Sequence, residues 1–184
     1  MSKKALVIFA DGFEEIEAVA PVDILRRAGV EVTVAGLASL EQTSARGVRV
    51  ICDSLLEDTI VRAGEFDALV LPGGGRGAEN LADSAVVREL VLRMHGEGKI
   101  IAAICAAPAV VLVRTGILSG KKATCYPGMQ VHFGADTLYL DEQVVEDGNI
   151  ITGRGAGAAA VFSLAIVGRL CGTGTRDRIA HAMM

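Results

Sequence analysis

Runs of hydrophobic residues alternate along the chain with amphipathic segments, and this pattern predicts alternating strands and helices. Largely apolar runs occur at residues 5–10, 66–71 and 99–104; the first is uninterrupted, and the other two each contain one charged residue. Each is typical of a parallel strand buried on both faces. Residues 14–28 and 84–96 instead have apolar positions at helical spacing, which predicts amphipathic helices.

The remaining elements follow from the same two patterns. We predict strands at 30–37, 48–52, 123–126, 143–145 and 149–152, a loop or short helical turn at 54–63, a connection at 77–83, and helices from 106 onward and at 157–170 and 173–184. Strands that alternate with helices at this spacing indicate an α/β fold with a doubly wound, mainly parallel sheet that has helices on both faces. The chain of 184 residues is expected to form one domain, 1–184.

Composition narrows the function classes. Hydrophobic residues make up 51% of the chain and charged residues 22%, as in an ordinary compact protein. The net charge of −4 argues against nucleic-acid binding, which needs clustered Lys and Arg. The longest apolar run is about 14 residues and contains Pro108, so it is shorter than the roughly 20 residues that span a bilayer. We therefore expect a cytoplasmic protein without nucleic-acid or membrane partners.

The cysteines do not form a metal motif. They are Cys52, Cys105, Cys125 and Cys171, and no two of them have the spacing of metal ligands. We therefore expect no metal site.

Residues with possible catalytic or binding roles lie at the ends of the predicted strands. Asp11, the glycine run 73–75, Cys105 and the loop 153–157 each follow a predicted strand, and the carboxyl ends of parallel strands share one edge of the sheet. The glycine runs fit the pattern GxGxxA, but neither lies in a first βαβ unit with an acidic residue about 20 positions later. Dinucleotide binding is therefore disfavoured.

Cys105 is predicted to lie at the turn between a buried strand and a helix. Pro108 fits the first turn of that helix, where a missing N–H costs nothing. At this position the N–H groups of the first helical turn favour a thiolate, as at a nucleophile elbow. The alternative is a buried structural cysteine that behaves as a small hydrophobic residue.

Two other groups are candidates for the same reaction. The backbone N–H of Gly73 or Gly74, together with that of Ala106, has the right placement to hold an oxyanion; the alternative is a tight exit from the strand. Glu17 lies beside the apolar stripe of the first helix, so its carboxyl either points inward with a raised pKa or is an ordinary exposed acid. His95, His132 and His181 are expected at the surface, away from this edge.

Four segments, in order along the chain, resemble the DJ-1/ThiJ/PfpI superfamily and its parkinsonism-associated deglycase branch. They read ALVIFADGFEEIEAVAPVDILRRAGVEVTVAGL, LPGGGRGAENL, AAICAAPAVVL and ITGRGAGAAAVFSLAIV. The resemblance implies a flavodoxin-like sandwich with a nucleophile elbow, a homodimer, and a reactive cysteine paired with a protonated carboxyl group.

The resemblance also assigns residues to roles. The catalytic positions are Cys105 as nucleophile, Glu17 as its carboxyl partner, and Gly74 and Ala106 as oxyanion donors; the substrate-binding positions are Gly73, Arg27, Arg46 and Tyr126, with the partner subunit as one source of Arg46. Many relatives have histidine where this chain has Tyr126. A tyrosine is a poor base near neutral pH, so we expect no Cys–His dyad.

The function implied by the resemblance is that of a glyoxalase or deglycase that needs no cofactor. The Cys105 thiolate would act on methylglyoxal or glyoxal, or on their early adducts with amines and thiols, in oxidative or carbonyl stress. The alternative is a redox-sensing or chaperone-like stress protein that uses oxidation of the same cysteine.

Overall fold

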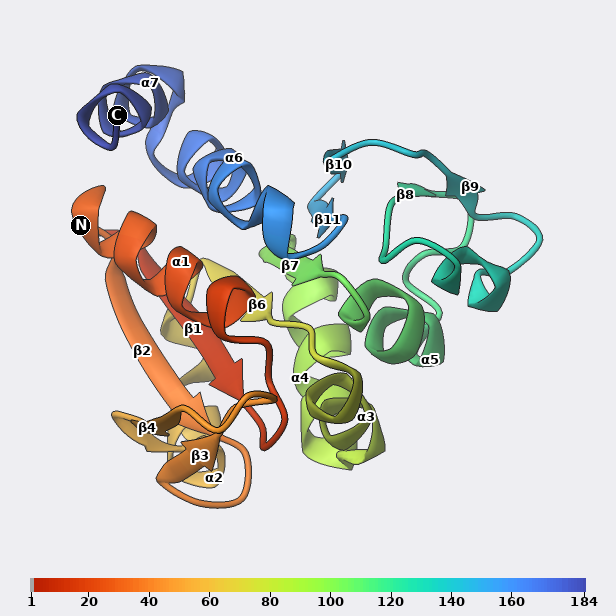
Figure 1. Ribbon diagram of the computed structural model, residues 1–184, viewed down its shortest axis with the longest axis horizontal. Coiled ribbons are helices and arrows are strands. Elements are labelled where there is room, and N and C mark those ends of the chain that lie inside the picture. Colours follow the sequence, from red (N-terminus) through yellow and green to blue (C-terminus); the bar gives the residue numbers. More distant parts are fainter. Residues whose placement is uncertain (1) are drawn as a thin grey trace.

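A seven-stranded sheet forms the centre of the computed structural model, which describes residues 2–184 (Figure 1). Its strands are β1 (Lys4–Phe9), β2 (Glu31–Gly36), β5 (Ser54–Leu55), β6 (Ala68–Leu71), β7 (Ile100–Ile104), β10 (Val144–Asp147) and β11 (Ile150–Gly153). The spatial order is β10-β11-β7-β6-β1-β2-β5. All neighbouring pairs are parallel except β10 and β11. The predicted doubly wound, mainly parallel fold is therefore confirmed.

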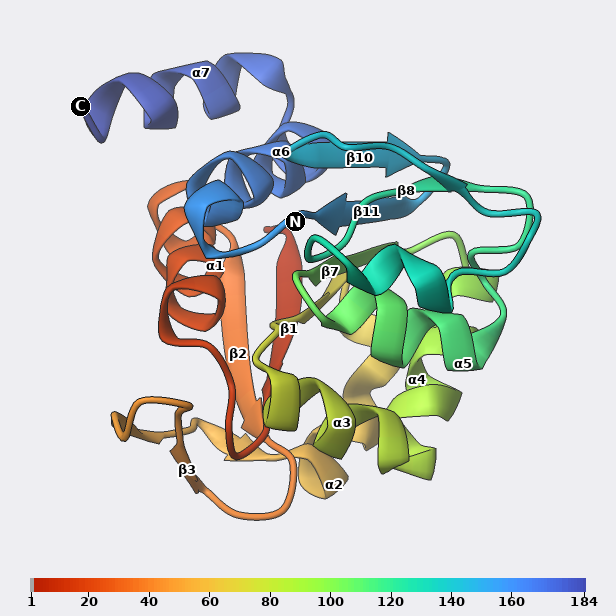
Figure 2. The same cartoon turned by 45° about the vertical axis from the view of Figure 1, so that its right-hand side comes forward.

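Helices cover both faces of this sheet (Figures 1 and 2). One layer contains α1 (Glu15–Arg27) and α6 (Ala159–Cys171), followed by α7 (Thr173–Ala182); the other contains α3 (Gly75–Asp83), α4 (Ala85–Gly96), the π-helical turn η2 (Pro108–Leu112) and α5 (Val113–Thr115). Strand β1 shows why its run is continuously apolar. Leu6 and Ile8 pack in the α3/α4 layer, whereas Val7 and Phe9 pack in the α1/α6 layer.

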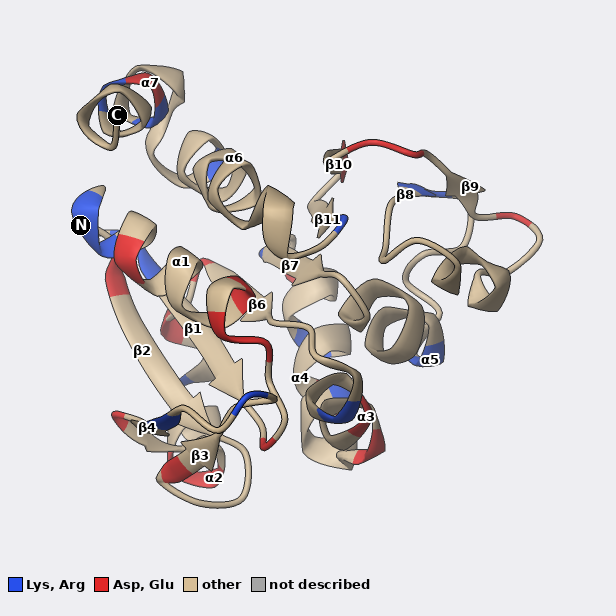
Figure 3. Cartoon of the chain, viewed as in Figure 1, with Lys and Arg blue, Asp and Glu red and all other residues tan. Residues whose placement is uncertain are grey.

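Short elements complete the chain. They are β3 (Glu41–Thr43), β4 (Arg49–Ile51), α2 (Leu56–Thr59), η1 (Ile60–Glu65), β8 (Lys122–Ala123), η3 (Met129–His132), β9 (Leu138–Tyr139) and η4 (Ala156–Ala158). Along residues 2–184, no helix is both long enough and apolar enough to cross a bilayer. Basic and acidic positions are interspersed over the ribbon in Figure 3, and α1 begins with acidic residues.

Two of the predicted strands lie outside the central sheet. The strand predicted at 48–52 is β4, which pairs antiparallel with β3 in a separate two-stranded sheet. Of the strand predicted at 123–126, only the start is extended, as β8, and it pairs with β9. Strand β3 has the sequence EQT, so it lacks the apolar run from which a strand could be predicted.

The segment predicted as a connection at 77–83 belongs to a helix. Helix α3 begins at Gly75, directly after Gly74, whose φ of 92° suits glycine. The glycines lower the intrinsic helix propensity, and packing compensates for this. A Cβ on Gly77 would lie 2.7 Å from the backbone nitrogen of Phe13, so the missing side chain lets α3 approach the loop between β1 and α1.

This close approach predicts a contrast between two glycines of α3. Gly77→Ala should destabilise the protein by about 1–3 kcal/mol, because the new methyl group must displace backbone atoms. Gly75→Ala is the matched control: a Cβ there meets nothing within 4 Å, and alanine is the better helix former by about 1 kcal/mol. Urea unfolding measures both free energies. Equal effects of the two substitutions would show that α3 is not held by this contact.

Candidate active site

Cys105 lies at the sharp turn where β7 ends and the following helix begins. Its φ of 65° is the only positive value at a non-glycine residue in the described part of the chain, a conformation that costs on the order of 1–3 kcal/mol. Two backbone hydrogen bonds hold it: Cys105 N–H donates to Gly153 O, and Tyr126 N–H donates to Cys105 O, both at 2.8 Å. The predicted elbow is therefore present, and the thiol is half-buried.

Glu17 lies in the first turn of α1, and its side chain is buried, with 1% exposed. Glu14 caps the helix by accepting the Glu17 N–H at 2.9 Å. The Glu17 carboxyl therefore points inward, as one of the two sequence alternatives predicted, and it contacts the Cys105 thiol through a side-chain hydrogen bond.

The glycine loop joins these two groups. Gly73 N–H donates to Glu17 Oε2 at 3.1 Å, and a Cβ on Gly73 would lie 2.4 Å from that oxygen and 2.6 Å from Cys105 Cβ. Only glycine therefore fits between the carboxyl and the thiol. The Gly73 N–H is thus already bonded to Glu17 within the chain, and the role of Gly73 in binding substrate stays a prediction.

Gly74 and Ala106 supply the amides that face the sulfur. Both backbone N–H groups hydrogen-bond to Cys105 and lower its pKa. Each stands at the beginning of a helical segment, where N–H groups are free to bind an anion. These are the two donors that the sequence predicted for an oxyanion.

Burial has the larger effect on both titratable groups. Desolvation raises the pKa of Glu17 to about 7. Desolvation, followed by the charge and hydrogen bond of Glu17, raises the pKa of Cys105 to about 12 despite the two amides. The expected stabilisation of a thiolate by helical N–H groups is thus outweighed while Glu17 is ionised. The site holds one negative charge most easily, so a thiolate forms when its proton passes to Glu17.

The two predicted arginines lie in different places. Arg46 forms ion pairs with Glu14 and Glu15 of its own chain, at 3.5 and 3.3 Å, and its charge lowers the pKa of Glu17. It therefore reaches the site without a partner subunit. Arg27 lies in the last turn of α1 and pairs with Asp23 at 2.8 Å. At 1.5 Å per residue, this is about 15 Å along the helix from Glu17, so the structure does not bring Arg27 to the site within one chain.

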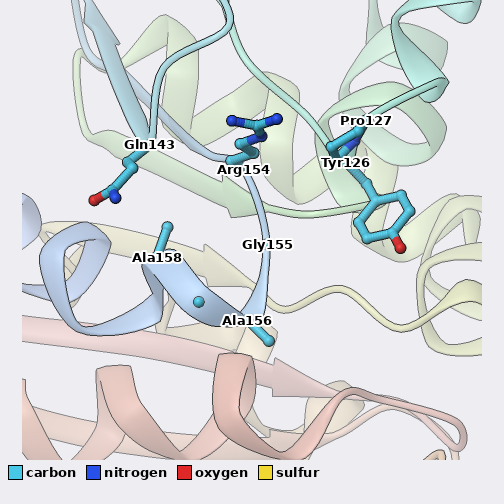
Figure 4. A pocket seen from close by; sticks show the side chains of 8 residues that line it. Tyr126, Pro127, Gln143, Arg154, Gly155, Ala156 and Ala158 are labelled. Atoms are coloured by element: carbon cyan, nitrogen blue, oxygen red, sulfur yellow. The ribbon is translucent and has the colours of Figure 1, made fainter.

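Tyr126 borders a cavity beside the Glu17–Cys105 pair. Its ring is 52% exposed and contributes to a cavity of about 420 Å³ (Figure 4). The other lining residues are Pro127, Gln143, Arg154, Gly155, Ala156, Gly157 and Ala158. Sequence reasoning placed the loop 153–157 at this edge but did not identify Arg154 or Gly155 as site residues. The available signal was the position of the loop after the strand next to β7.

Histidines and metal ligands are not part of this site. Among the residues that the structure describes, no histidine hydrogen-bonds to Cys105 or Glu17. His181 is exposed and His132 lines a separate cavity with Glu79. His95 is half-buried on α4, and its Nδ1 is buried without a hydrogen-bond partner. Over the same residues, His, Cys, Asp and Glu form no group of three that could hold a metal ion.

The raised pKa of Glu17 predicts a pH-dependent stability. Between the ordinary value of 4.5 and about 7, the unfolded chain releases this proton while the folded chain keeps it, so stability falls as pH rises. This contribution is about 3 kcal/mol. Glu17→Gln removes it, so the variant should gain about 3 kcal/mol relative to the wild type between pH 4 and pH 8.

Urea unfolding at the two pH values measures this gain. Glu89→Gln on α4, where the side chain is exposed, is the matched control and should show no comparable change. The assignment of a buried, protonated carboxyl would be wrong if both variants followed the wild type across this range.

Comparison with known proteins places this arrangement in a family. The model of the DJ-1/PfpI family matches residues 3–169. Protein dj-1beta of Drosophila melanogaster is 42% identical over 186 residues, covering 100% of this chain and 98% of that protein. The Parkinson disease protein 7 homolog of Danio rerio is 45% identical over 173 residues, covering 92% and 90%. A deglycase of Pyrococcus abyssi is 37% identical over 154 residues, covering 82% and 89%.

Solved structures of relatives have the same fold. The crystal structure of Drosophila melanogaster DJ-1beta superposes with a TM-score of 0.95 at 42% identity, covering 100% of this chain and 98% of that chain. Oxidized Toxoplasma gondii DJ-1 superposes with a TM-score of 0.94 at 38% identity, covering 99% and 98%. The resemblance found in the sequence is confirmed: the chain belongs to the DJ-1/PfpI family.

Proposed function

We propose that this protein is a glyoxalase or deglycase that needs no cofactor and acts on methylglyoxal, glyoxal or their early adducts. The observation that supports this proposal is the placement of one thiol between two backbone N–H donors and a buried carboxyl group. A nucleophile, a proton carrier and an oxyanion site are the parts that addition to an aldehyde requires. The deglycase of Pyrococcus abyssi among its relatives supports the same activity.

The reaction begins with a proton transfer within the pair. Glu17 accepts the thiol proton, and the Cys105 sulfur forms a bond to the aldehyde carbon of methylglyoxal. The aldehyde oxygen becomes an oxyanion, which the N–H groups of Gly74 and Ala106 bind. Glu17 then returns its proton to this oxygen and completes a hemithioacetal. Because Glu17 has a pKa of about 7, it can both accept and donate a proton near neutral pH.

The second half of the reaction moves hydrogen within the substrate. Glu17 takes the proton from the former aldehyde carbon and returns a proton to the neighbouring carbonyl carbon, while the hydroxyl proton passes to the neighbouring oxygen, which yields a thioester of lactate. Water then breaks the carbon–sulfur bond and releases lactate and the thiol. One carbon is oxidised and its neighbour is reduced, so the sum consumes one water and no external electron carrier. With an adduct, the bond from the same carbon to the amine or thiol breaks as the bond to Cys105 forms, and Glu17 gives the proton taken from Cys105 to the departing amine or thiol.

Replacement of Cys105 tests this function. Cys105→Ser should reduce the release of lactate from methylglyoxal to the uncatalysed rate, because a serine hydroxyl beside Glu17 is a far weaker nucleophile than a thiolate. Chromatographic measurement of lactate, on protein freed of contaminating glyoxalase, gives the rate. Cys171→Ser, at a half-buried cysteine of α6, is the matched control and should keep the wild-type rate. Turnover retained in Cys105→Ser would overturn the proposal.

A second candidate function uses the same atoms. Cys105 is accessible, whereas Cys52 and Cys125 are buried, and one relative was solved as oxidized Toxoplasma gondii DJ-1. Peroxide would convert the thiolate to a sulfinate in two steps, each adding one oxygen and releasing one water. A protonated Glu17 would then donate a hydrogen bond to the sulfinate. This reading describes a redox-sensing stress protein.

Mass spectrometry after mild peroxide treatment tests the second candidate. We expect a selective gain of two oxygens on Cys105, with the half-buried Cys171 as the internal control. Glu17→Ala should shift the product toward further oxidation, because the sulfinate loses its hydrogen-bond donor. Equal oxidation of all four cysteines would argue against a sensor.

A further inference from the structure

The cavity bordered by Tyr126 and Arg154 has no role in the reaction written above. Its volume of about 420 Å³ lies within the range of roughly 300–1,000 Å³ that is usual for small-molecule sites. Cys105 and Glu17 are not among its lining residues, so a small dicarbonyl bound at Cys105 leaves this space for another part of a larger substrate. Figure 4 shows the Arg154 side chain between Gln143 and Pro127, with Tyr126 on one side and the Gly155–Ala158 turn below.

Two lining residues connect the cavity to the reacting groups. A Cβ on Gly155 would lie 3.9 Å from Glu17 Oε1 and 3.6 Å from Tyr126 Cδ2, so Gly155, which lines the cavity, lies close to the Glu17 carboxyl group. Tyr126 N–H donates to Cys105 O at 2.8 Å. Gly155 and Tyr126 therefore connect the lining of the cavity to the Glu17–Cys105 pair.

A single charged side chain contributes to the cavity. Arg154 is the one charged member among the eight lining residues. Its Nη2 pairs with Asp141 Oδ1 at 3.1 Å, but the Asp141 side chain is 63% exposed, and exposed pairs of this kind bind weakly. A guanidinium has five N–H donors in a planar fork that matches a carboxylate, so Arg154 can bind a second carboxylate.

The turn at the base of the cavity adds to this preference. It contains no acidic residue and has no capping side chain at its beginning. The Ala158 N–H is used within the turn, where it donates to Gly155 O at 2.8 Å, but the positive end of the α6 dipole, which follows the turn, favours a negative group. The helix dipole thus supports Arg154 as the principal binding group.

We propose that this cavity binds the carboxylate of a small amino acid or thiol carried by a dicarbonyl adduct, with Arg154 as the residue that determines this specificity. This inference rests on the proposed function and narrows its substrate class. The dicarbonyl carbon of the adduct meets Cys105, while the carrier, with its free carboxylate, occupies the space next to Tyr126. Adducts of carboxylate-bearing carriers are thereby preferred over neutral ones.

A binding experiment tests the inference without depending on turnover. The probe is S-(2-oxopropyl)-N-acetylcysteine, a stable thioether that resembles the adduct of methylglyoxal with a carboxylate-bearing thiol; its methyl ester is the neutral control ligand. Calorimetric titration gives both dissociation constants. The wild type should bind the acid about tenfold more tightly than the ester, as a hydrogen bond to a charged group implies.

Three variants locate the preference. Arg154→Gln should bring the ratio of the two dissociation constants close to one. Asp141→Asn should raise the ratio above that of the wild type, because it removes the competing carboxylate. Arg169→Gln is the matched control: Arg169 lies on α6, pairs with Glu146 at 3.3 Å and does not line the cavity, so the wild-type ratio should remain.

The outcomes separate this inference from the proposed function. Equal binding of acid and ester by the wild type, or a preference that persists in Arg154→Gln, overturns the role of Arg154, even if the wild type converts methylglyoxal to lactate. A preference that is lost in Arg154→Gln and increased in Asp141→Asn supports the carboxylate site. Absence of lactate from methylglyoxal in the wild type would contradict the glyoxalase alone.

Discussion

The surrounding structure depends on one contact, which is the contact between the buried Glu17 carboxyl group and the Cys105 thiol. An ionised carboxyl group is expensive to bury, yet here burial and the Gly73 N–H hold it against a thiol. Glu14 caps α1 by accepting the Glu17 N–H, which fixes the position of the Glu17 backbone. The glycine loop leaves the space in which the Glu17 and Cys105 side chains meet. Elements from both helical layers therefore position the carboxyl group and the thiol.

Burial, more than helix dipoles, sets the protonation of this pair. The amides of Gly74 and Ala106 do lower the pKa of Cys105, as expected for helical N–H groups. Their effect is smaller than that of desolvation together with the Glu17 charge. In the proposed reaction, the amides contribute mainly when an oxyanion forms, since they are already oriented and need no reorganisation. The protonation of Glu17 therefore determines whether Cys105 is a thiol or a thiolate.

Much of the fold could be predicted because its strands are buried on both faces. The runs that became β1, β6 and β7 are continuously apolar, and Cys105 follows the last of them. Helix α3 was not recognised because glycine suppresses helix propensity, while its stability comes from contacts with a distant loop. Arg154 was missed for a related reason. Its neighbours in the cavity come from separate segments that only the folded chain brings together.

The strained elbow gives the thiol a dependence on residues far from it in sequence. Cys105 keeps its φ of 65° while Gly153 and Tyr126 hold its two backbone groups. Strand β11 and the segment that follows β8 therefore each form a backbone hydrogen bond with this one residue. The position of the Cys105 sulfur, which faces the amides of Gly74 and Ala106 and the Glu17 carboxyl group, therefore depends on hydrogen bonds from two segments that lie far along the chain from the elbow.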